Sequence, residues 1–221
     1  MVRNKIESVR RRIVQAAESA GRDPAGVRLI AVTKTVPVDR IKEAIACGIT
    51  EIGENRVQEA QAKRLEIGPA VRWHLIGHLQ KNKTKFAIEL FDQIQSLDSV
   101  ELLELLERAA QRPLDTLIQV NISGEKTKQG VAQDQVELLA DRLTQCKHLR
   151  WTGLMTIAPY SNDPEAARPV FRALRQLRDS LQQKYSRPLG LSMGMSGDFE
   201  TAVQEGATAV RVGSAIFGER A

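Results

Sequence analysis

Eight short apolar runs alternate with longer helical patterns along the sequence, and this alternation constrains the fold more than any other feature. The runs span residues 27–33, 49–53, 71–76, 93–97, 116–122, 149–157, 189–192 and 209–213. Successive strands that are joined by helices are parallel, and eight such units fit a closed barrel. The sequence therefore predicts an α/β fold, a (β/α)8 barrel of the TIM type. An open doubly wound sheet is the alternative, because a strand count taken from one sequence can shift.

The helical patterns are equally regular, and one of them precedes the first run. Up to about Ala20, apolar residues recur at helical spacing, which predicts an extra N-terminal helix that buries Ile6, Val9, Ile13 and Ala17. Later helices are expected over residues 38–47, over 98–110 with Asp98 as N-cap, and over 164–184. No Gly/Pro/Ser-rich linker interrupts the rhythm, so residues 1–221 are expected to form a single domain.

The composition restricts the structural class of the protein and the cellular compartment in which it is expected. Of the 221 residues, 42% are hydrophobic and only 4% are aromatic, which is typical of aliphatic cores built on buried parallel strands. No apolar stretch approaches the roughly 20 residues that cross a bilayer, and the N-terminus has no apolar signal segment. Cys47 and Cys146 belong to no CxxC pair or histidine cluster, which predicts two reduced thiols. We expect a cytoplasmic protein that has no membrane partner.

A net charge of +5 raises the question of nucleic-acid binding. The candidate basic stretches are Arg10 to Arg12 and the series Lys81, Lys83 and Lys85. Both stretches fall on predicted helices that are rich in glutamate, and no aromatic residues are interleaved for base stacking. Solvated helix faces commonly have this pattern, so no nucleic-acid partner is expected.

Lys34 closes the first apolar run and falls at the end of the strand where barrels carry their functional residues. One interpretation is structural, because a lysine at a strand end can extend its ammonium to water while its stem stays buried. The other interpretation is chemical. Partial burial lowers the pKa of an ammonium, and the neutral amine can then attack an aldehyde and form an imine. The position alone leaves both interpretations open.

Two loops near the end of the sequence predict an anion site. The segment from Ser192 to Glu200 follows the seventh strand and opens a helix, so backbone N–H groups at Ser196 and Gly197 can face a phosphate. The eighth strand ends by presenting Gly213 and the Ser214 hydroxyl. Loops after strands seven and eight form the recurrent phosphate site of this architecture. Arg211 precedes Gly213 by two residues, so strand alternation directs both to one side, where the arginine could contact a bound ring or form an ion pair.

Polar residues also follow the second and third strands. Asn55 and Arg56 come after the second strand, and His74 is expected to face into the barrel end, with His78 on the following loop. Neither histidine has metal-ligand spacing or an evident carboxylate partner in the sequence, so we predict no metal site. His148 precedes a strand at the opposite end of the barrel, where function is not expected.

Seven sequence blocks, in order, cover nearly the whole chain. They span residues 31–34, 53–59, 74–83, 121–130, 153–156, 192–198 and 211–214. Together they resemble the family of pyridoxal phosphate homeostasis proteins, also called the proline synthase co-transcribed homologue family. The resemblance implies a barrel of pyridoxal 5′-phosphate (PLP) fold type III, similar to the barrel domain of alanine racemase, with PLP in imine linkage to Lys34.

The same resemblance implies roles for the other site residues. The phosphate contacts correspond to Ser196, Gly197, Gly213 and Ser214, and the partner of the pyridine nitrogen corresponds to Arg211. Two further cofactor-lining positions correspond to Asn55 and His74. The implied function is intracellular PLP homeostasis, in which PLP is held as a Schiff base and released or passed to PLP-dependent apo-enzymes. Effects on amino-acid and keto-acid metabolism would then be indirect.

The sequence favours a carrier over an enzyme. Arg211 cannot accept the ring proton, so the cofactor is a weaker electron sink than it is beside a carboxylate. Racemisation also needs a second proton donor, and Tyr160 is the tyrosine placed to reach the mouth, whereas Tyr185 ends a helix away from it. Seven residues follow Ser214, so no second domain is expected to cover the cofactor. An uncovered mouth suits exchange better than turnover.

Two alternatives stay open. The first is a fold-type-III racemase or lyase that acts on a small amino acid. The second is a phosphosugar-type barrel without PLP, which explains the phosphate loops and leaves Lys34 unexplained. The absence of an obvious exposed apolar helix face favours a monomer.

Overall fold

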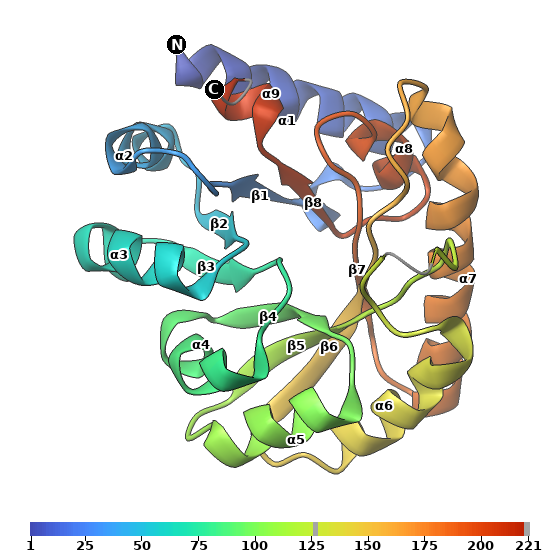
Figure 1. The fold of residues 1–221 in the computed structure, drawn as a ribbon. Helices are drawn as coiled ribbons and strands as arrows, with labels where there is room; N and C mark the ends of the chain where they lie inside the picture. Colours follow the sequence, from blue (N-terminus) through green and yellow to red (C-terminus); the bar gives the residue numbers. More distant parts are fainter. Residues whose placement is uncertain (126–127, 219–221) are drawn as a thin grey trace.

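Eight parallel strands close into a barrel in the order of the sequence, as the alternating pattern predicts (Figure 1). The computed structural model describes residues 1–125 and 128–218, so Lys126 and Thr127 of the 121–130 block lie outside the described residues, as do residues 219–221. The open-sheet alternative is wrong, because β1 pairs with β8 as well as with β2. The strands are β1 (Arg28–Val32), β2 (Glu51–Glu54), β3 (Arg72–Leu75), β4 (Gln93–Leu97), β5 (Leu114–Gln119), β6 (Leu149–Met155), β7 (Gly190–Ser192) and β8 (Ala209–Val212).

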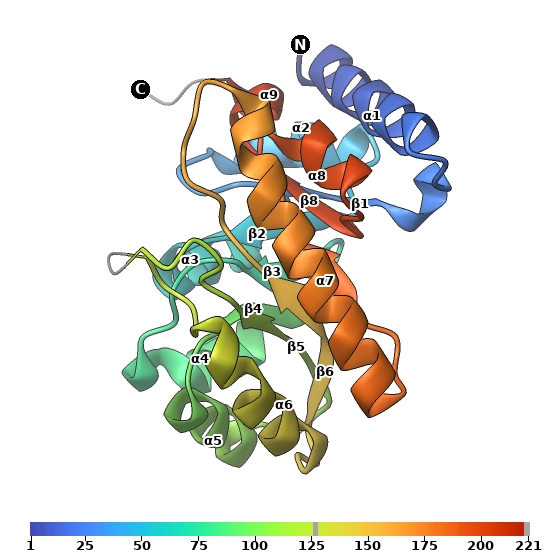
Figure 2. The same cartoon turned by 90° about the vertical axis from the view of Figure 1, so that its right-hand side faces the viewer.

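Helices follow the strands and surround the barrel (Figures 1 and 2). The expected N-terminal helix is present as α1, and its predicted apolar face is buried against α8 and α9. The α-helices are α1 (Val2–Ser19), α2 (Val38–Ala46), α3 (Val57–Ile67), α4 (Thr84–Leu90), α5 (Val100–Ala109), α6 (Val136–Thr144), α7 (Arg168–Tyr185), α8 (Phe199–Gln204) and α9 (Ser214–Phe217). Short 3-10 turns are η1 (Pro24–Gly26), η2 (Lys81–Lys83), η3 (Gln133–Gln135) and η4 (Pro164–Ala167).

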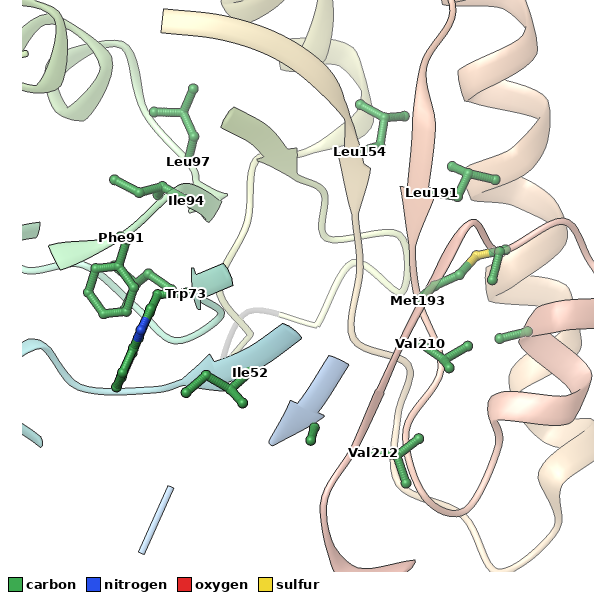
Figure 3. Packing of buried hydrophobic residues seen from close by; sticks show 14 of the residues in the cluster. Ile52, Trp73, Phe91, Ile94, Leu97, Leu154, Leu191, Met193, Val210 and Val212 are labelled. Atoms are coloured by element: carbon green, nitrogen blue, oxygen red, sulfur yellow. The ribbon is translucent and has the colours of Figure 1, made fainter. Parts of the chain in front are cut away.

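The main core lies between the strands and the helices. Outward-facing strand residues such as Ile52, Ile94 and Leu191 are fully buried there, and the aromatic pair Trp73 and Phe91 fills the space beside them (Figure 3). Each of these side chains removes apolar surface from water and contributes roughly 1.5–3 kcal/mol of stabilisation when fully buried. No described helix is long and apolar enough to span a membrane.

Two local predictions need correction. The N-cap of α5 is Ser99, whose hydroxyl accepts a hydrogen bond from Leu102 N at 3.2 Å, and Asp98 instead lies 3.5 Å from His78 Nδ1. The helix predicted over 164–184 is divided into η4 and α7, and Asp163 caps its first turn by accepting from Glu165 N. At α5 the Asp98 carboxylate faces His78, and the next hydroxyl along the chain caps the helix.

Candidate functional site

A pocket of about 300 Å³ opens at the carboxyl ends of the strands. All of the predicted site residues except His74 line it: Lys34, Asn55, Ser196, Gly197, Arg211, Gly213 and Ser214. They come from β1, β2, β7 and β8, whose ends meet because the barrel is closed. A concave site of this size that combines apolar walls with a few polar groups is typical of a small-molecule or cofactor site.

The backbone on both sides of Lys34 is fixed by a buried ionic cluster from β2 and α3. Lys63 Nζ donates to Thr33 O at 2.6 Å and to the carboxylates of Glu54 and Glu59, each at 2.7 Å. Glu59 also accepts a hydrogen bond from Thr35 N. Thr35 has φ of 61°, a left-handed conformation that is strained for a β-branched residue. The cluster therefore holds the turn that presents Lys34, whose side chain is half-buried at the pocket.

The two carboxylates of this cluster have different environments. Burial raises the pKa of Glu54, against the opposing effects of Lys63 and the Thr33 hydroxyl, because Glu54 is fully buried and its Oε2 has no hydrogen-bond partner among the described residues. Burial also acts to raise the pKa of Glu59, but hydrogen bonds from Lys63 and Thr35 outweigh it, and the net pKa is lowered. Glu59 is therefore the firmly ionised partner of Lys63.

The two predicted anion loops contact one another through Ser196. Its Oγ accepts hydrogen bonds from Gly213 N at 3.2 Å and from Ala215 N at 3.3 Å. These backbone N–H groups point to one spot, beside the exposed Ser214 and at the first turn of α9. Convergent N–H groups and hydroxyls are the donors that a phosphate group uses. The arrangement is a cradle for a phosphate-sized anion.

Helix α1 holds the start of α8, and thus the Ser196 loop, in place. Arg12 binds Glu200 through two hydrogen bonds of 2.7 Å, and its guanidinium lies 4.5 Å from the ring centre of Phe199. Gly194 (φ 92°) turns the chain tightly before the loop, where a Cβ would lie 2.5 Å from the Ala202 Cβ. The extra N-terminal helix therefore supports the anion cradle from outside the barrel.

Arg211 lies beneath the pocket and is anchored at both of its terminal nitrogens. Nη1 donates to Ser192 Oγ and Nη2 donates to Thr156 O, each at 2.8 Å. Burial lowers the pKa of the guanidinium to about 10, and Asp198 partly opposes this shift. Arg211 is thus cationic at neutral pH, and it presents a fixed donor rather than a base to a ring in the pocket.

The structure does not bring His74 to the pocket. The ring is fully buried inside the barrel, with Nδ1 2.9 Å from Gln93 Oε1 and Nε2 2.8 Å from Glu51 Oε2. The carboxylate partner that the sequence did not reveal is therefore Glu51, which lies across the β2–β3 pairing. His74 therefore does not line the pocket, contrary to expectation, and its connection to the pocket is indirect.

That connection is a chain of buried polar side chains through the barrel interior. Gln95 lies next to His74 and Gln93, and its Oε1 accepts a hydrogen bond of 2.6 Å from Ser192, which in turn accepts from Arg211. Gln95 is on β4 and Ser192 is on β7, so this bond crosses the barrel. Because buried polar groups are costly when unpaired, each member of the chain fixes its neighbours.

Replacing Gln95 by leucine tests whether these buried polar side chains stabilise one another. We expect the Gln95→Leu variant to lose about 1–3 kcal/mol of unfolding free energy, because the Ser192 hydroxyl loses its acceptor and the apolar side chain satisfies neither neighbour. Urea unfolding followed by circular dichroism measures the change. Gln133→Leu, at an exposed position in η3, is the matched control and is expected to change stability by less than about 0.5 kcal/mol. Equal stability of the two variants would contradict the role of Gln95.

Sequence reasoning missed several pocket residues. Asp198 lines the pocket, and burial raises the pKa of its carboxyl even though Oδ1 accepts from Met195 N. Ile76, Ile157 and Met195 supply apolar walls. Asp198 follows the Ser-Gly pair directly before α8, which is an N-cap signal that could have identified it. The apolar walls had no comparable signal, because such residues look like any other strand end.

Tyr160 lies at the rim of the pocket, and Tyr185 lies away from it, as expected. Tyr160 is 91% exposed, and its hydroxyl bonds Asn162 at 3.1 Å. Tyr185 bonds Asp141 and packs edge-to-face on Trp151. Within the described part of the chain, no group of three or more His, Cys, Asp or Glu residues could hold a metal ion.

The fold and the pocket define a class: a (β/α)8 barrel that presents a lysine amine, a buried arginine and a phosphate-sized anion cradle at one mouth. These are the groups that PLP requires, an amine for its aldehyde, N–H donors for its phosphate and a polar partner for its ring. The family model of the alanine racemase N-terminal domain matches residues 5–221. The chain belongs to the family of pyridoxal phosphate homeostasis proteins.

Two relatives of that name illustrate the likeness. The Pyridoxal phosphate homeostasis protein of Aquifex aeolicus is 44% identical, over 98% of this chain and 97% of its own. The human protein of the same name is 38% identical, over 97% of this chain and 85% of its own.

Solved structures agree with this membership. The structure of PipY from Synechococcus elongatus with PLP bound has a TM-score of 0.86 and 37% identity, and the match covers 99% of this chain and all of that one. An alanine racemase from Corynebacterium glutamicum, at 17% identity and a TM-score of 0.72, shares the fold over 97% of this chain and 61% of its own. The expected fold type is therefore confirmed.

Proposed function

We propose that this protein binds PLP for intracellular PLP homeostasis and holds it as a Schiff base until it is released or transferred. The observation that carries the proposal is the convergence of Lys34, Arg211 and the Ser196 cradle in one pocket. The family membership and the PLP-bound PipY structure support it. Amino-acid and keto-acid metabolism would be affected through the supply of the cofactor.

Each residue has a definite task in this proposal. Lys34 would hold PLP through its amine, and the ionic cluster around Lys63 fixes the backbone that presents this lysine. Ser196, Gly197, Gly213 and Ser214 hold the phosphate through hydroxyl and backbone donors, and Arg211 donates to the pyridine nitrogen. Asn55 lines the same pocket as Lys34 and would contact the bound cofactor. When bound, PLP would supply a reactive aldehyde.

A carrier fits the site better than an enzyme. Arg211 is cationic and held by two acceptors, so it does not keep the pyridine nitrogen protonated in the way that a carboxylate does. Tyr160, the tyrosine at the rim, is almost fully exposed and bonds Asn162 rather than a group in the pocket. The rim therefore leaves the pocket accessible to water and other amines, which would favour exchange of a bound cofactor.

Two measurements test this function. Adding PLP and then borohydride should fix the cofactor on the peptide that contains Lys34, and an unlabelled peptide would remove both the carrier and the racemase hypotheses. Incubating the loaded protein with single amino acids in deuterated water tests turnover. Rapid exchange of the α-hydrogen that is lost in a Tyr160→Phe variant would establish the alternative function, a fold-type-III racemase or lyase.

Replacing Ser196 by alanine tests the phosphate cradle. We expect the Ser196→Ala variant to bind PLP roughly tenfold more weakly, since it loses a phosphate donor and the hydroxyl that joins the two loops. Titration of the cofactor-free protein, followed by absorbance, measures the affinity. Ser180→Ala, on the outer surface of α7, is the control that should bind as the wild type does. Unchanged affinity in both variants would remove Ser196 from the site.

The setting of the protein is part of the proposal. We place it in the cytoplasm, as a single-domain monomer that exchanges PLP with PLP-dependent apo-enzymes and binds neither nucleic acid nor membrane. Three of its large exposed apolar side chains, Leu65, Phe86 and Leu138, belong to three different helices, α3, α4 and α6. Two free cysteines fit a reducing compartment. Analytical ultracentrifugation tests the oligomeric state, and faster PLP loss on addition of an apo-enzyme tests the transfer.

A further inference from the structure

A second cavity adjoins the cofactor pocket at the mouth of the barrel. Its volume is about 690 Å³, and it lies between the ends of β2 and β3 and the segment after β6. Asn55, Ile76 and Ile157 line both cavities, so they form a shared wall. A molecule that reaches Lys34 from this side would extend into the second cavity.

The lining of the second cavity is positive. Among the described residues, three side chains that can carry a positive charge line it, Arg56, His78 and Lys83, and no described aspartate or glutamate does. His78 faces Asp98 at 3.5 Å, whereas neither Arg56 nor Lys83 forms a salt bridge with a described carboxylate. Lys83 Nζ instead lies 5.8 Å from the ring centre of Phe86. Arg56 interacts with the Glu59 carboxylate only beyond salt-bridge distance, and Lys83 has no carboxylate partner among the described residues, so both cations can attract an anionic group at the mouth of the pocket.

The shared wall adds an acceptor. Asn55 Oδ1 is buried and has no hydrogen-bond partner among the described residues. The loop after β3 packs directly on the loop that carries Asn55, since a Cβ at Gly77 would lie 2.4 Å from Asn55 O. The wall is therefore built by close backbone contact, and an N–H donor that enters between the cavities would satisfy the buried oxygen.

We propose that the second cavity binds the carboxylate of a free α-amino acid whose amine displaces Lys34 from the cofactor. Arg56 and Lys83 hold the carboxylate, and Asn55 Oδ1 accepts a hydrogen bond from the amine. This site deepens the proposed function and rests on it, since it names the class of small molecule that releases the cofactor from Lys34.

The exchange of Lys34 for the amino-acid amine conserves atoms and electrons and needs no added reagent. The amino-acid nitrogen forms the new C=N bond to the aldehyde carbon of PLP while the bond from that carbon to Lys34 Nζ breaks. Protons of the incoming amine pass to Lys34 Nζ, which leaves as a free amine. No oxidant, reductant or net water takes part.

The experiment compares two amines on the loaded protein, L-alanine and L-alaninamide, which lacks the carboxylate. Absorbance after each addition gives the concentration that displaces half of the Lys34 linkage. The ratio of the two concentrations, compared between protein variants, cancels the difference in amine basicity. In an Arg56→Gln/Lys83→Gln variant, the preference for L-alanine should fall by at least about tenfold, because two charge-assisted contacts are lost.

Lys85→Gln is the matched control, since Lys85 is an exposed cation in the first turn of α4, two residues after Lys83, and lines neither cavity. It should keep the wild-type ratio. An unchanged ratio in the Arg56→Gln/Lys83→Gln variant would overturn the inference. Failure of the wild type to form the borohydride-stable linkage would instead overturn the proposed function, so the two failures are distinguishable.

A second readout needs no cofactor. Addition of L-alanine to the cofactor-free protein should shift the amide resonances of Gly77 and His78, and the shifts should be lost in the Arg56→Gln/Lys83→Gln variant. Equal shifts in that variant, or no shifts in the wild type at the concentration that displaces half of the linkage, would overturn the carboxylate site.

Discussion

Replacing Lys34 by arginine is expected to abolish the borohydride-stable attachment of PLP while the positive charge at the mouth is kept. A guanidinium does not lose its proton under these conditions and cannot form the imine. The phosphate cradle is unchanged in this variant, so weak, reversible binding of PLP should persist. Mass spectrometry of the reduced protein, followed by peptide mapping, measures the loss of the label.

The control for this experiment is Lys85→Arg, an exposed lysine outside the pocket that makes the same chemical change. It should retain a full label on Lys34. A label that persists in the Lys34→Arg variant would place the imine on another lysine and contradict the site assignment. The buried Lys63 would be the first lysine to check in the peptide map, since its Nζ donates a hydrogen bond to Thr33 O, directly before Lys34.

Replacing Lys63 by methionine is expected to cost about 3–5 kcal/mol of unfolding free energy. Lys63 and Glu54 form a buried ion pair at 2.7 Å, and removal of the lysine leaves a carboxylate that is fully buried and unpaired. The Thr33 carbonyl also loses its donor. Denaturant unfolding measures the change. Lys42→Met, which removes an exposed partner of Glu66, should change stability by less than about 0.5 kcal/mol.

The unfolding free energy lost in the Lys63→Met variant should depend on pH in a defined direction. Burial already raises the pKa of Glu54 above its ordinary value of 4.5, and removal of Lys63 takes away the largest opposing contribution. The folded variant then binds a proton at Glu54 more tightly than the unfolded chain does. Its stability is therefore fully present below pH 4.5 and decreases as the pH rises through the raised pKa. The deficit relative to the wild type should be small in acid and largest at neutral pH.

A double variant separates the effect of the buried charge on stability from the effect of packing. Glu54→Met/Lys63→Met removes both partners, and its stability should return to within about 1–2 kcal/mol of the wild type, because an apolar pair of similar volume replaces the ion pair. Stability as low as that of Lys63→Met alone would contradict this account. PLP affinity should be lowered in both Lys63→Met and the double variant, since each lacks the donor to the Thr33 carbonyl beside Lys34.

The barrel and the position of its site were predictable from local features. Strands and helices differ in the period of their apolar residues, and each unit needs only its own residues to show that period. The rule that parallel strands end at one mouth then placed Lys34, Asn55, Arg211 and the Ser196 loop together before any contact was known. Boundaries were less exact, as β5 begins at Leu114 rather than at residue 116.

Contacts between residues far apart in the chain were not predictable. His74 was expected beside the cofactor, but Glu51 and Gln93 hold it inside the barrel, and it reaches Arg211 through Gln95 and Ser192. Asp98 has the chemistry of an N-cap, yet it faces His78, and Ser99 takes the cap. Strand period gives the side to which a residue points, but not how deep it lies along the barrel axis or which residue it meets.

The sequence by itself determined the barrel, the mouth at which its function lies and the lysine that closes the first strand. Those properties depend on residue order and on strand alternation, which the sequence displays directly. Only the tertiary structure decided what surrounds that lysine, namely the Lys63 cluster that holds its backbone, the buried chain below Arg211 and the positive cavity beyond Asn55. Burial and pairing depend on all the elements packed around a residue, and therefore emerge only when the barrel closes.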